Sequence, residues 1–439
     1  MKYSRSGSWV YSIVIVALLL VTVNVTRAGN WPCWRGPTGI GNTDEKDLPL
    51  KWDGATKENL LWKVPLGGIG NSSPVVWGDK VFVTVSRKQT NKQQDAKEIP
   101  EHWVACFQVA DGKELWRTPV PPGRYPRGYG IYAVPTPVTD GKQVYCWFGS
   151  GVFATLDFDG KIVWRNEVPG ELPKNIDGLI NSPILFEGTV IRIVNVDQRG
   201  ANGVVQAVDV KTGDVKWQKP LAKTSSANAS PILMPVNGKL QLIVASSNLL
   251  EALNPADGTA IWSFKRHMGD LSPVYGSGLL YTDCPGGPGM AIDPAGAGDI
   301  TKTNAKWKID KTPSSYAYAS PIIAGDYIYR AAKPGLLSCW KLSTGELVYA
   351  ETLDGITNLA SPILTADGLL YFVTSGKSYI IKPGPKLEVV GTNELGGFHG
   401  NNGASPAIAD GRIYVRDAEP AGPAGAFLYC ITTVPSEVE

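Results

Sequence analysis

Hydrophobic residues along this chain occur in runs of about four to six, rich in β-branched and aromatic side chains and bounded by Gly, Asp or Asn. Runs of this kind are typical of short β-strands joined by tight turns. The stretch ASPIIAGDYIYR, residues 319–330, shows the arrangement well, because two apolar runs flank a Gly-Asp turn and a Ser-Pro pair precedes them. The pattern predicts paired strands along the chain rather than long helices.

Near-copies of this stretch recur throughout the sequence. Their prolines are Pro74, Pro137, Pro183, Pro231, Pro273, Pro321, Pro362 and Pro406, separated by 63, 46, 48, 42, 48, 41 and 44 residues. A self-similar period near 45 residues predicts a solenoid, propeller or other repeat array. Pro suits the first position of an innermost strand, where no ladder donor is needed, and we expect the adjacent Ser to bond backbone locally and set the turn.

A second signature lies between the Ser-Pro pairs and is clearest in AVDVKTGDVKW, Ala207 to Trp217. The same frame occupies residues 106–116, 252–262 and 339–349. Its small first residue leaves room for a large neighbour, and its Asp and Gly form a tight turn that tolerates positive φ. The final Trp is expected to pack against the next unit. Each unit therefore has four strands.

The two ends of the repeat region complement each other. NLLWKVPL, residues 59–66, is a Trp strand with no unit before it, whereas the last unit ends at residues 427–433 without its Trp strand. Closure of a ring would pair these strands and remove exposed sheet edges. We therefore predict an all-β, eight-bladed β-propeller over residues 59–433, with Trp62 near Tyr414 and Tyr429, followed by a C-terminal tail, 434–439.

Residues 1–28 are predicted to be a signal peptide, because Lys2 and Arg5 precede a long apolar stretch and Ala28 offers a small cleavage residue. Retention as an uncleaved anchor is the alternative. Because no Cys follows the apolar stretch directly, the pattern does not favour a lipoprotein anchor. Either reading predicts an exported protein, periplasmic or secreted, with no membrane span after cleavage.

Charge and cysteine content narrow the function classes. A net charge of +2 gives no electrostatic case for a nucleic-acid partner. The six cysteines match no compact disulfide framework, and His102, His267 and His399 are too far apart to suggest a metal site. Cys106, Cys339 and Cys430 occupy the small-residue position of the frame and are expected to be buried free thiols. Cys33, Cys146 and Cys284 remain candidates for pairing.

The frame Ala-x-Asp-x-x-Thr-Gly-x-x-x-Trp resembles the tryptophan-docking motif of pyrroloquinoline-quinone (PQQ) repeat proteins. These form eight-bladed propellers and include quinoprotein alcohol dehydrogenases and BamB-type outer-membrane assembly factors. NWPCWRGPTGIG, residues 30–41, resembles the opening of exported planctomycete members. We expect residues 29–58 to form a clasp across the side of the ring. Use of Trp31, Trp34 or Arg35 in binding is the alternative.

The resemblance also bears on cofactors. Quinoprotein dehydrogenases hold PQQ against Ca²⁺ with a carboxylate base, and many stack PQQ on a disulfide between adjacent cysteines. This sequence has no Cys-Cys pair and no C-x-x-C-H haem site, and no calcium-binding set matches a family motif. We therefore expect no cofactor and no catalytic residues, with PQQ as the alternative.

Residues just before each Ser-Pro pair should ring one mouth of the central channel. A ring of Asn and Tyr would offer donors and acceptors to a small polar ligand, although Asn is also common in simple turns. The loop 118–135 should enter the same face. The candidate ligand-binding residues are Asn71, Tyr132, Asn181, Asn228, Asp270, Tyr318, Asn358, Asn402, His399, Arg124, Arg127 and Tyr129.

The function expected from the sequence is binding or scaffolding in the cell envelope, by a monomer whose partner is an envelope protein or a small polar ligand. Two alternatives from other classes are a PQQ-dependent dehydrogenase and a carbohydrate-binding or carbohydrate-processing protein. Fold alone does not separate them, because one propeller can carry unrelated sites.

Overall fold

The computed structural model describes residues 29–87, 99–123, 132–168, 180–194, 203–221, 229–246, 248–266, 271–284, 286–313, 318–332, 335–355, 360–397, 403–417 and 426–433. All the regular structure in these ranges is β-strand. The predicted signal peptide and C-terminal tail lie outside the described residues. Over the ranges given above, no helix is long and apolar enough to cross a membrane.

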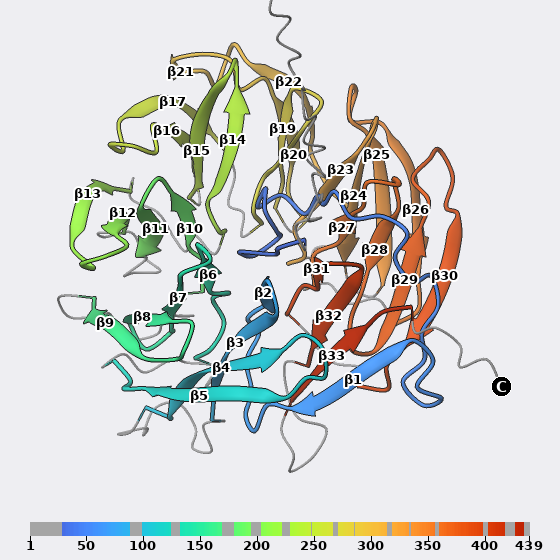
Figure 1. Ribbon diagram of the computed structural model, residues 1–439. Coiled ribbons are helices and arrows are strands. Elements are labelled where there is room, and N and C mark those ends of the chain that lie inside the picture. Colours follow the sequence, from blue (N-terminus) through green and yellow to red (C-terminus); the bar gives the residue numbers. More distant parts are fainter. Residues whose placement is uncertain are drawn as a thin grey trace, which may run out of the picture.

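Eight small sheets stand around a ring, which confirms the eight-bladed β-propeller (Figure 1). Blades one to four are β2–β5 (Val75–Trp77, Lys80–Ser86, His102–Gln108, Glu114–Val120), β6–β9 (Val138–Thr139, Gln143–Trp147, Val152–Asp157, Ile162–Glu167), β10–β13 (Ile184–Phe186, Thr189–Val194, Val204–Asp209, Val215–Pro220) and β14–β17 (Ile232–Val236, Lys239–Ala245, Leu249–Leu253, Ala260–Lys265).

The remaining blades follow in chain order. Blades five to seven are β18, β19, β20 and β22 (Val274–Gly276, Leu279–Thr282, Gly289–Ile292, Ala305–Ile309), β23–β26 (Ile322–Ala324, Tyr327–Ala332, Leu336–Lys341, Leu347–Thr352) and β27–β30 (Ile363–Leu364, Leu370–Phe372, Lys377–Ile381, Val389–Glu394). Blade eight joins β31–β33 (Ala407–Ala409, Arg412–Arg416, Phe427–Ile431) to β1 (Leu60–Pro65). Every innermost strand begins one residue after a repeat Pro, as the sequence pattern predicts.

The N-terminal strand closes the ring. β1 pairs antiparallel with β33, with Trp62 opposite Cys430, so residues from both ends of the repeat region form one sheet. The Trp62 and Tyr414 rings lie 6.0 Å apart, which confirms the predicted position of this tryptophan. An open ring would leave two unpaired strand edges, and this pairing removes them.

At seven of the eight junctions between blades, the Ser or Thr before the repeat Pro bonds to the next blade rather than to its own turn. The backbone N–H of Ser73 donates to Thr136 Oγ1 at 2.9 Å, and that of Thr136 donates to Ser182 Oγ at 3.0 Å. The series continues through Ser182–Ser230, Ser230–Ser272, Ser320–Ser361, Ser361–Ser405 and Ser405–Ser73 at 2.9–3.0 Å. The local-turn interpretation of these serines is wrong, because the neighbouring hydroxyl is the better-placed acceptor.

The junction between blades five and six is held differently. Among the described residues, Ser272 and Ser320 are not joined by the hydroxyl bond found at the other junctions. Arg330 of β24 instead reaches Asp283, just after β19, with a 2.7 Å ion pair whose two side chains are fully buried. Tyr281 also donates to this carboxylate, at 3.1 Å. A buried charge is costly unless it is paired and hydrogen-bonded, and here both conditions are met.

Five of the six tryptophans at the end of the repeat frame lie on the turn of the following blade, as the sequence predicts. The indole N–H groups of Trp62, Trp116, Trp164, Trp217 and Trp307 donate to the carbonyls of Val109, Phe158, Val210, Pro255 and Leu342 at 2.8–3.2 Å. The turn glycine lies under the ring, and a Cβ at Gly112 would come within 2.7 Å of Trp62. Gly112 also has φ +72°. Both the space and the φ angle therefore require Gly.

Trp262 is the exception, because the turn of blade five is lengthened. Its indole N–H donates to Gln241 within its own blade, at 2.9 Å. The additional residues of blade five form β21 (Gly298–Asp299), which pairs in parallel with β17 beside Trp262. The insertion therefore covers the outer edge of blade four instead of forming a docking turn.

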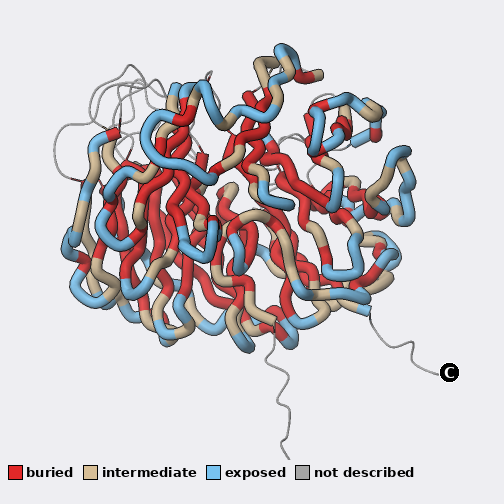
Figure 2. The backbone as a smooth tube through the Cα atoms, turned by 90° about the horizontal axis from the view of Figure 1, so that it is seen from above, coloured by how far each residue is buried: buried red, intermediate tan, exposed pale blue. Residues whose placement is uncertain are grey.

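Most residues of the inner strands are buried, whereas many residues of the turns are exposed (Figure 2). All six cysteines are free and buried. Cys106, Cys339 and Cys430 lie opposite Trp116, Tyr349 and Trp62 in their sheets, in the small-residue position predicted for them. Burial raises the pKa of the Cys106 thiol to about 12, so this group stays protonated and unreactive at neutral pH.

Candidate functional site

The centre of the ring is occupied by the chain's own N-terminal segment (Figure 1). Residues 31–45, here called the axial plug, contact innermost strands on several sides. Trp31 and Val76 of β2 exchange two backbone hydrogen bonds of 2.9 Å, and Thr139 of β6 donates to Pro32. Across the ring, Leu364 of β27 donates to Gly41 at 2.8 Å. A short segment therefore joins blades one, two and seven along the axis.

The plug enters and leaves at the same face. Near its start, Asn30 Oδ1 accepts the N–H of Gly78 at 2.9 Å. At its end, the Glu45 carboxylate accepts the N–H groups of Asp410 and Gly411 at 2.8 and 2.9 Å. Gly78 and Gly411 both belong to turns between the first and second strands of a blade, so this end of the ring is called the turn face. The opposite end, where the repeat prolines begin the innermost strands, is the Ser-Pro face.

The interpretation of residues 29–58 as a clasp on the side of the ring holds for only part of the segment. Leu50 to Gly54 do lie on the outer wall, along β30 of blade seven. The plug itself is axial, because Trp31 is completely buried among the innermost strands of blades one and eight. The sequence shows that this Trp is apolar, but it contains no signal for which wall of the ring buries it.

Arg35 lies at the tip of the plug. Its φ of 60° and the following Gly36 turn the chain back, and Arg35 O accepts the N–H of Gly41 at 3.0 Å. The side chain is only 2% exposed, and Nη2 donates to the carbonyl of Pro321 at 2.9 Å. Pro321 directly follows Ser320 of the hydroxyl series. The guanidinium therefore lies on the axis at the level of the Ser-Pro pairs.

Burial strips water from this guanidinium and lowers the pKa of Arg35 to about 9. The group remains cationic at neutral pH. Its Nε and Nη1 atoms are buried and have no hydrogen-bond partner in the described structure. The Arg35 charge also approaches the Trp34 ring, at 5.7 Å from the centroid. The sequence suggested a binding role for Trp34 and Arg35 only as the alternative to a clasp. The position of the Arg35 charge at the ring centre is set by the fold.

The predicted mouth residues divide into two groups. Four lie in described segments: Asn71, Tyr132, Asn181 and Tyr318. Asn228, Asp270, Asn358, Asn402, His399, Arg124, Arg127 and Tyr129 lie outside the described residues. Convergence of the whole set is therefore still a prediction.

The four described residues have different surroundings. Asn181 Nδ2 donates to the carbonyl of Ala229 at 2.6 Å, so its amide bridges blades three and four. Asn71 is half-buried and lies against Gly403 of blade eight. Tyr318 is 40% exposed, whereas Tyr132 is completely buried. Asn71 and Asn181 thus line blade junctions at the Ser-Pro face.

Tyr132 belongs to a stack of three rings. The imidazole of His102 lies between Tyr132 and Phe148, with both ring centroids 5.1 Å away and interplanar angles of 26° and 13°. Both imidazole nitrogens are buried and unpartnered in the described structure. Burial lowers the pKa of His102 to about 4. The stack therefore holds a neutral imidazole and acts as packing.

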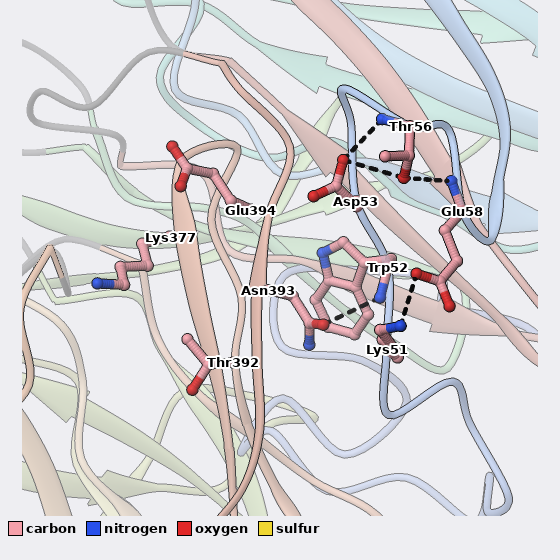
Figure 3. Close-up of a pocket in the computed structure, with 9 residues that line it drawn as sticks. All are labelled: Lys51, Trp52, Asp53, Thr56, Glu58, Lys377, Thr392, Asn393 and Glu394. Carbon is pink, nitrogen blue, oxygen red and sulfur yellow. Dashed lines mark hydrogen bonds and ion pairs between the residues drawn. The ribbon is translucent and has the colours of Figure 1, made fainter.

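A groove of about 390 Å³ lies on the outer wall of blade seven (Figure 3). It is lined by Lys51, Trp52, Asp53, Thr56, Glu58, Lys377, Thr392, Asn393 and Glu394. Lys51 pairs with Glu58 at 3.0 Å, and Asp53 accepts the N–H groups of Ala55 and Thr56. Because these charged groups already bond to neighbouring groups of the segment, they have little capacity left to bind a ligand.

The seam beside this groove has a structural role. In blade seven Gly391 stands at the position where the other blades carry a large aromatic residue, which is Trp or, in blade six, Tyr349. The backbone N–H of Trp52 donates to Asn393 Oδ1 at 2.9 Å, and that of Gly54 donates to the carbonyl of Glu394 at 2.8 Å. The N-terminal segment therefore covers the blade that lacks an aromatic residue at this position.

The described residues do not fit a PQQ held against a metal ion. Within the described ranges, no group of three or more His, Cys, Asp or Glu side chains is arranged to hold a metal. The buried Trp31 and Arg35 of the plug occupy the ring centre, so a flat cofactor placed on the axis there would have to displace them. Among the described residues, no carboxylate pairs with Arg35, so its charge would repel a divalent metal bound beside it.

The four-stranded blades, the Trp–Gly docking and the closed ring together define a PQQ-like β-propeller. A family model described as outer membrane protein assembly factor BamB matches residues 100–268. These residues cover the two outer strands of blade one and the whole of β6–β17 in blades two to four, so the match falls on the repeats rather than on the plug.

Individual relatives agree with this class. BamB of Moranella endobia is 24% identical over 264 residues, which is 56% of this chain and 63% of that protein. The chain thus spans less than two thirds of that relative. BamB of Yersinia pestis is 22% identical over 334 residues, covering 70% of this chain and 76% of the relative. The predicted likeness of the N-terminal motif to planctomycete proteins stays a prediction.

Among solved structures, a quinohemoprotein alcohol dehydrogenase from Comamonas testosteroni is similar, with a TM-score of 0.64 and 14% identity. The match covers 95% of this chain and 82% of that one. At this identity the likeness shows the fold alone, and function must be argued from the residues.

Proposed function

We propose that this protein is a binding or scaffolding propeller of the cell envelope. The observation that carries the proposal is the axial plug: the buried Trp31 and Arg35 fill the ring centre, so a cofactor or substrate could not enter there without displacing them. The contacts of the plug with blades one, two and seven stabilise the closed ring. Recognition is then left to the surfaces of the ring and to the Ser-Pro face.

Two further observations support this role. The family model and both curated relatives are BamB proteins, named as outer membrane protein assembly factors. The apolar stretch and basic start of residues 1–28 are typical of an exported chain. An envelope protein is therefore the partner class that we propose, with the Ser-Pro face around Asn71, Asn181 and Tyr318 as its docking region.

Proteomic capture tests the proposal. The full chain, tagged at its C-terminus, would be expressed in its native host and cross-linked in intact cells before purification. We expect one or a few envelope proteins to be enriched over an unrelated exported propeller of similar size. Replacement of the exposed Tyr318 by Asp should reduce that enrichment, because a charge opposes burial in an interface. Recovery equal to the control would contradict the role.

A dehydrogenase makes the opposite prediction. Purified protein would be incubated with PQQ and Ca²⁺ and assayed for reduction of an artificial acceptor with alcohols and sugars. We expect rates no higher than those of heat-inactivated protein. Saturable turnover would overturn the scaffold proposal in favour of the enzyme. Retention on a polysaccharide resin without turnover would instead favour the carbohydrate-binding alternative.

A further inference from the structure

The two ends of the axial plug meet at one turn of blade eight. The Glu45 carboxylate accepts the backbone N–H groups of Asp410 and Gly411, one on each oxygen, at 2.8 and 2.9 Å. Gly29 lies against the same group, because a Cβ added to it would collide with Glu45 Oε1 and lie 3.1 Å from the backbone nitrogen of Asp410. The chain just before the plug therefore lies against the residue that ends it.

The Glu45 carboxylate can accept a further donor. Each oxygen of an ionised carboxylate has about two acceptor positions, and in the described structure each accepts one backbone N–H. Among the described residues, no Lys or Arg side chain pairs with Glu45. The side chain is half-buried, so a cation placed beside it would be screened less by salt than a pair on the open surface.

Charged side chains flank this point in three segments, which are the blade-eight turn, the blade-one turn that bonds Asn30, and the plug itself. They are Asp410, Arg412, Asp79, Lys80, Asp44 and Lys46. The blade-eight and blade-one residues form ion pairs within their own turns, at 2.7 and 3.1 Å. The two plug residues are exposed and opposite in sign. These charges cancel, so the negative charge of Glu45 has no counter-charge among them.

Signal cleavage would supply a cation at this place. Ala28 is the small residue that follows the apolar stretch, and an envelope signal peptidase cuts after such a residue. Hydrolysis of the Ala28–Gly29 peptide bond uses one water molecule. Its oxygen completes a carboxylate on Ala28, and its two hydrogens convert the Gly29 N–H into an ammonium group. The mature chain would then begin with a positive charge at Gly29.

We propose that this new N-terminus pairs with Glu45 and fastens the axial plug in the ring. The nitrogen and the place of a Cβ are arranged around the same Cα atom, so rotation about the Cα–C bond of the terminal Gly29 swings the ammonium toward Oε1. In the uncleaved chain this nitrogen is a neutral amide bonded to Ala28. Cleavage therefore turns a neutral contact into an ion pair between the two ends of the plug. The inference does not depend on the proposed scaffold role.

The site of cleavage and the state of the new amine can both be measured. Mass spectrometry of the protein exported by its native host should place the N-terminus at Gly29. The pH dependence of labelling by acetic anhydride then gives the α-amino pKa, which we expect to lie roughly half a unit or more above the usual 7.7–8.0. Glu45→Gln should return it to that range. Glu58→Gln is the matched control, because it removes a carboxylate that pairs with Lys51 in the same N-terminal segment.

A second pair of proteins measures the effect on stability. A chain released from a tag so that it begins at Ala28 carries the same charge one residue further from Glu45. At pH 7 we expect it to melt about 1–2 °C below the chain that begins at Gly29, the scale of one partly exposed ion pair. A raised α-amino pKa stabilises below about pH 7.7, and this contribution is lost as the pH rises through the folded-state value. The difference should therefore vanish at pH 10.

Three results would overturn the proposal. They are an exported chain whose N-terminus is not Gly29, an α-amino pKa that Glu45→Gln leaves unchanged, and equal melting temperatures at pH 7 for the chains that begin at Ala28 and Gly29.

Discussion

The backbone N–H of Ser405 donates to the hydroxyl of Ser73 at 3.0 Å, although 332 residues separate them in the chain. This bond joins blade eight to blade one and belongs to the series of hydroxyl bonds at the Ser-Pro face, which in the described structure is interrupted between blades five and six. Together with the pairing of β1 and β33, it closes the ring at both its inner and its outer strands.

Removal of one hydroxyl from this series should destabilise the whole ring. In Ser73→Ala the N–H of Ser405 loses its acceptor in a buried setting, which costs about 1–3 kcal/mol of unfolding free energy. Ser73→Thr should cost much less, because Thr136 already fills the equivalent position. Urea unfolding of both variants checks this. Equal losses would show that the hydroxyl bond contributes nothing specific.

The docking of Trp62 on Gly112 can be separated from backbone strain. Gly112→Ala introduces a Cβ 2.7 Å from the indole and also strains φ, whereas Gly78→Ala at φ +58° meets no atom within 4 Å. We expect Gly78→Ala to cost about 1–2 kcal/mol from φ alone. Gly112→Ala should cost about 1–3 kcal/mol more, through overpacking. Thermal unfolding measures both, and equal costs would argue against docking.

Burial should determine how much each of two ion pairs of equal length contributes to the free energy of unfolding. Arg330–Asp283 and Arg412–Asp410 are both 2.7 Å long, but the first is fully buried and the second is partly exposed. Arg330→Met leaves Asp283 buried without its cation and should cost about 3–5 kcal/mol. Arg412→Met should cost about 0–1 kcal/mol. Chemical denaturation of the two variants checks the order, and similar losses would contradict it.

His102 should make the protein acid-sensitive. Its pKa is about 4 in the folded state against about 6.5 when unfolded. Below pH 6.5 His102 binds a proton in the unfolded chain but not in the folded chain. The free energy of unfolding is therefore unaffected by this group above pH 6.5 and falls as the pH approaches 4. The loss reaches about 3 kcal/mol.

His102→Phe keeps an aromatic ring between Tyr132 and Phe148 but removes the titrating group. The difference in unfolding free energy between wild type and variant should therefore change between pH 7 and pH 4, with the wild type losing more. Urea titrations at several pH values measure this difference. Parallel pH profiles for the two proteins would show that His102 does not titrate as proposed.

The sequence by itself determined the architecture. Strand length, turn residues and the period near 45 are local properties, repeated eight times, so each copy reinforces the others. Ring closure was also predicted from the sequence. Residues 59–66 form a Trp strand with no unit before it, and the last unit, ending at residues 427–433, lacks its Trp strand, so pairing the two leaves no exposed sheet edge. The docking of Trp62 near Tyr414 followed from the same pattern.

Only the tertiary structure decided which groups meet. Ser73 and Ser405 are hydrogen-bond partners because the ring brings their blades together, and a serine that could bond locally gives no sign of this. The positions of Trp31 and Arg35 were likewise undetermined, because a short apolar segment fits the side of a ring or its axis equally well by composition. Burial of Arg35 depends on contacts with Pro321 and Gly41 that are set by the closed ring rather than by neighbouring sequence.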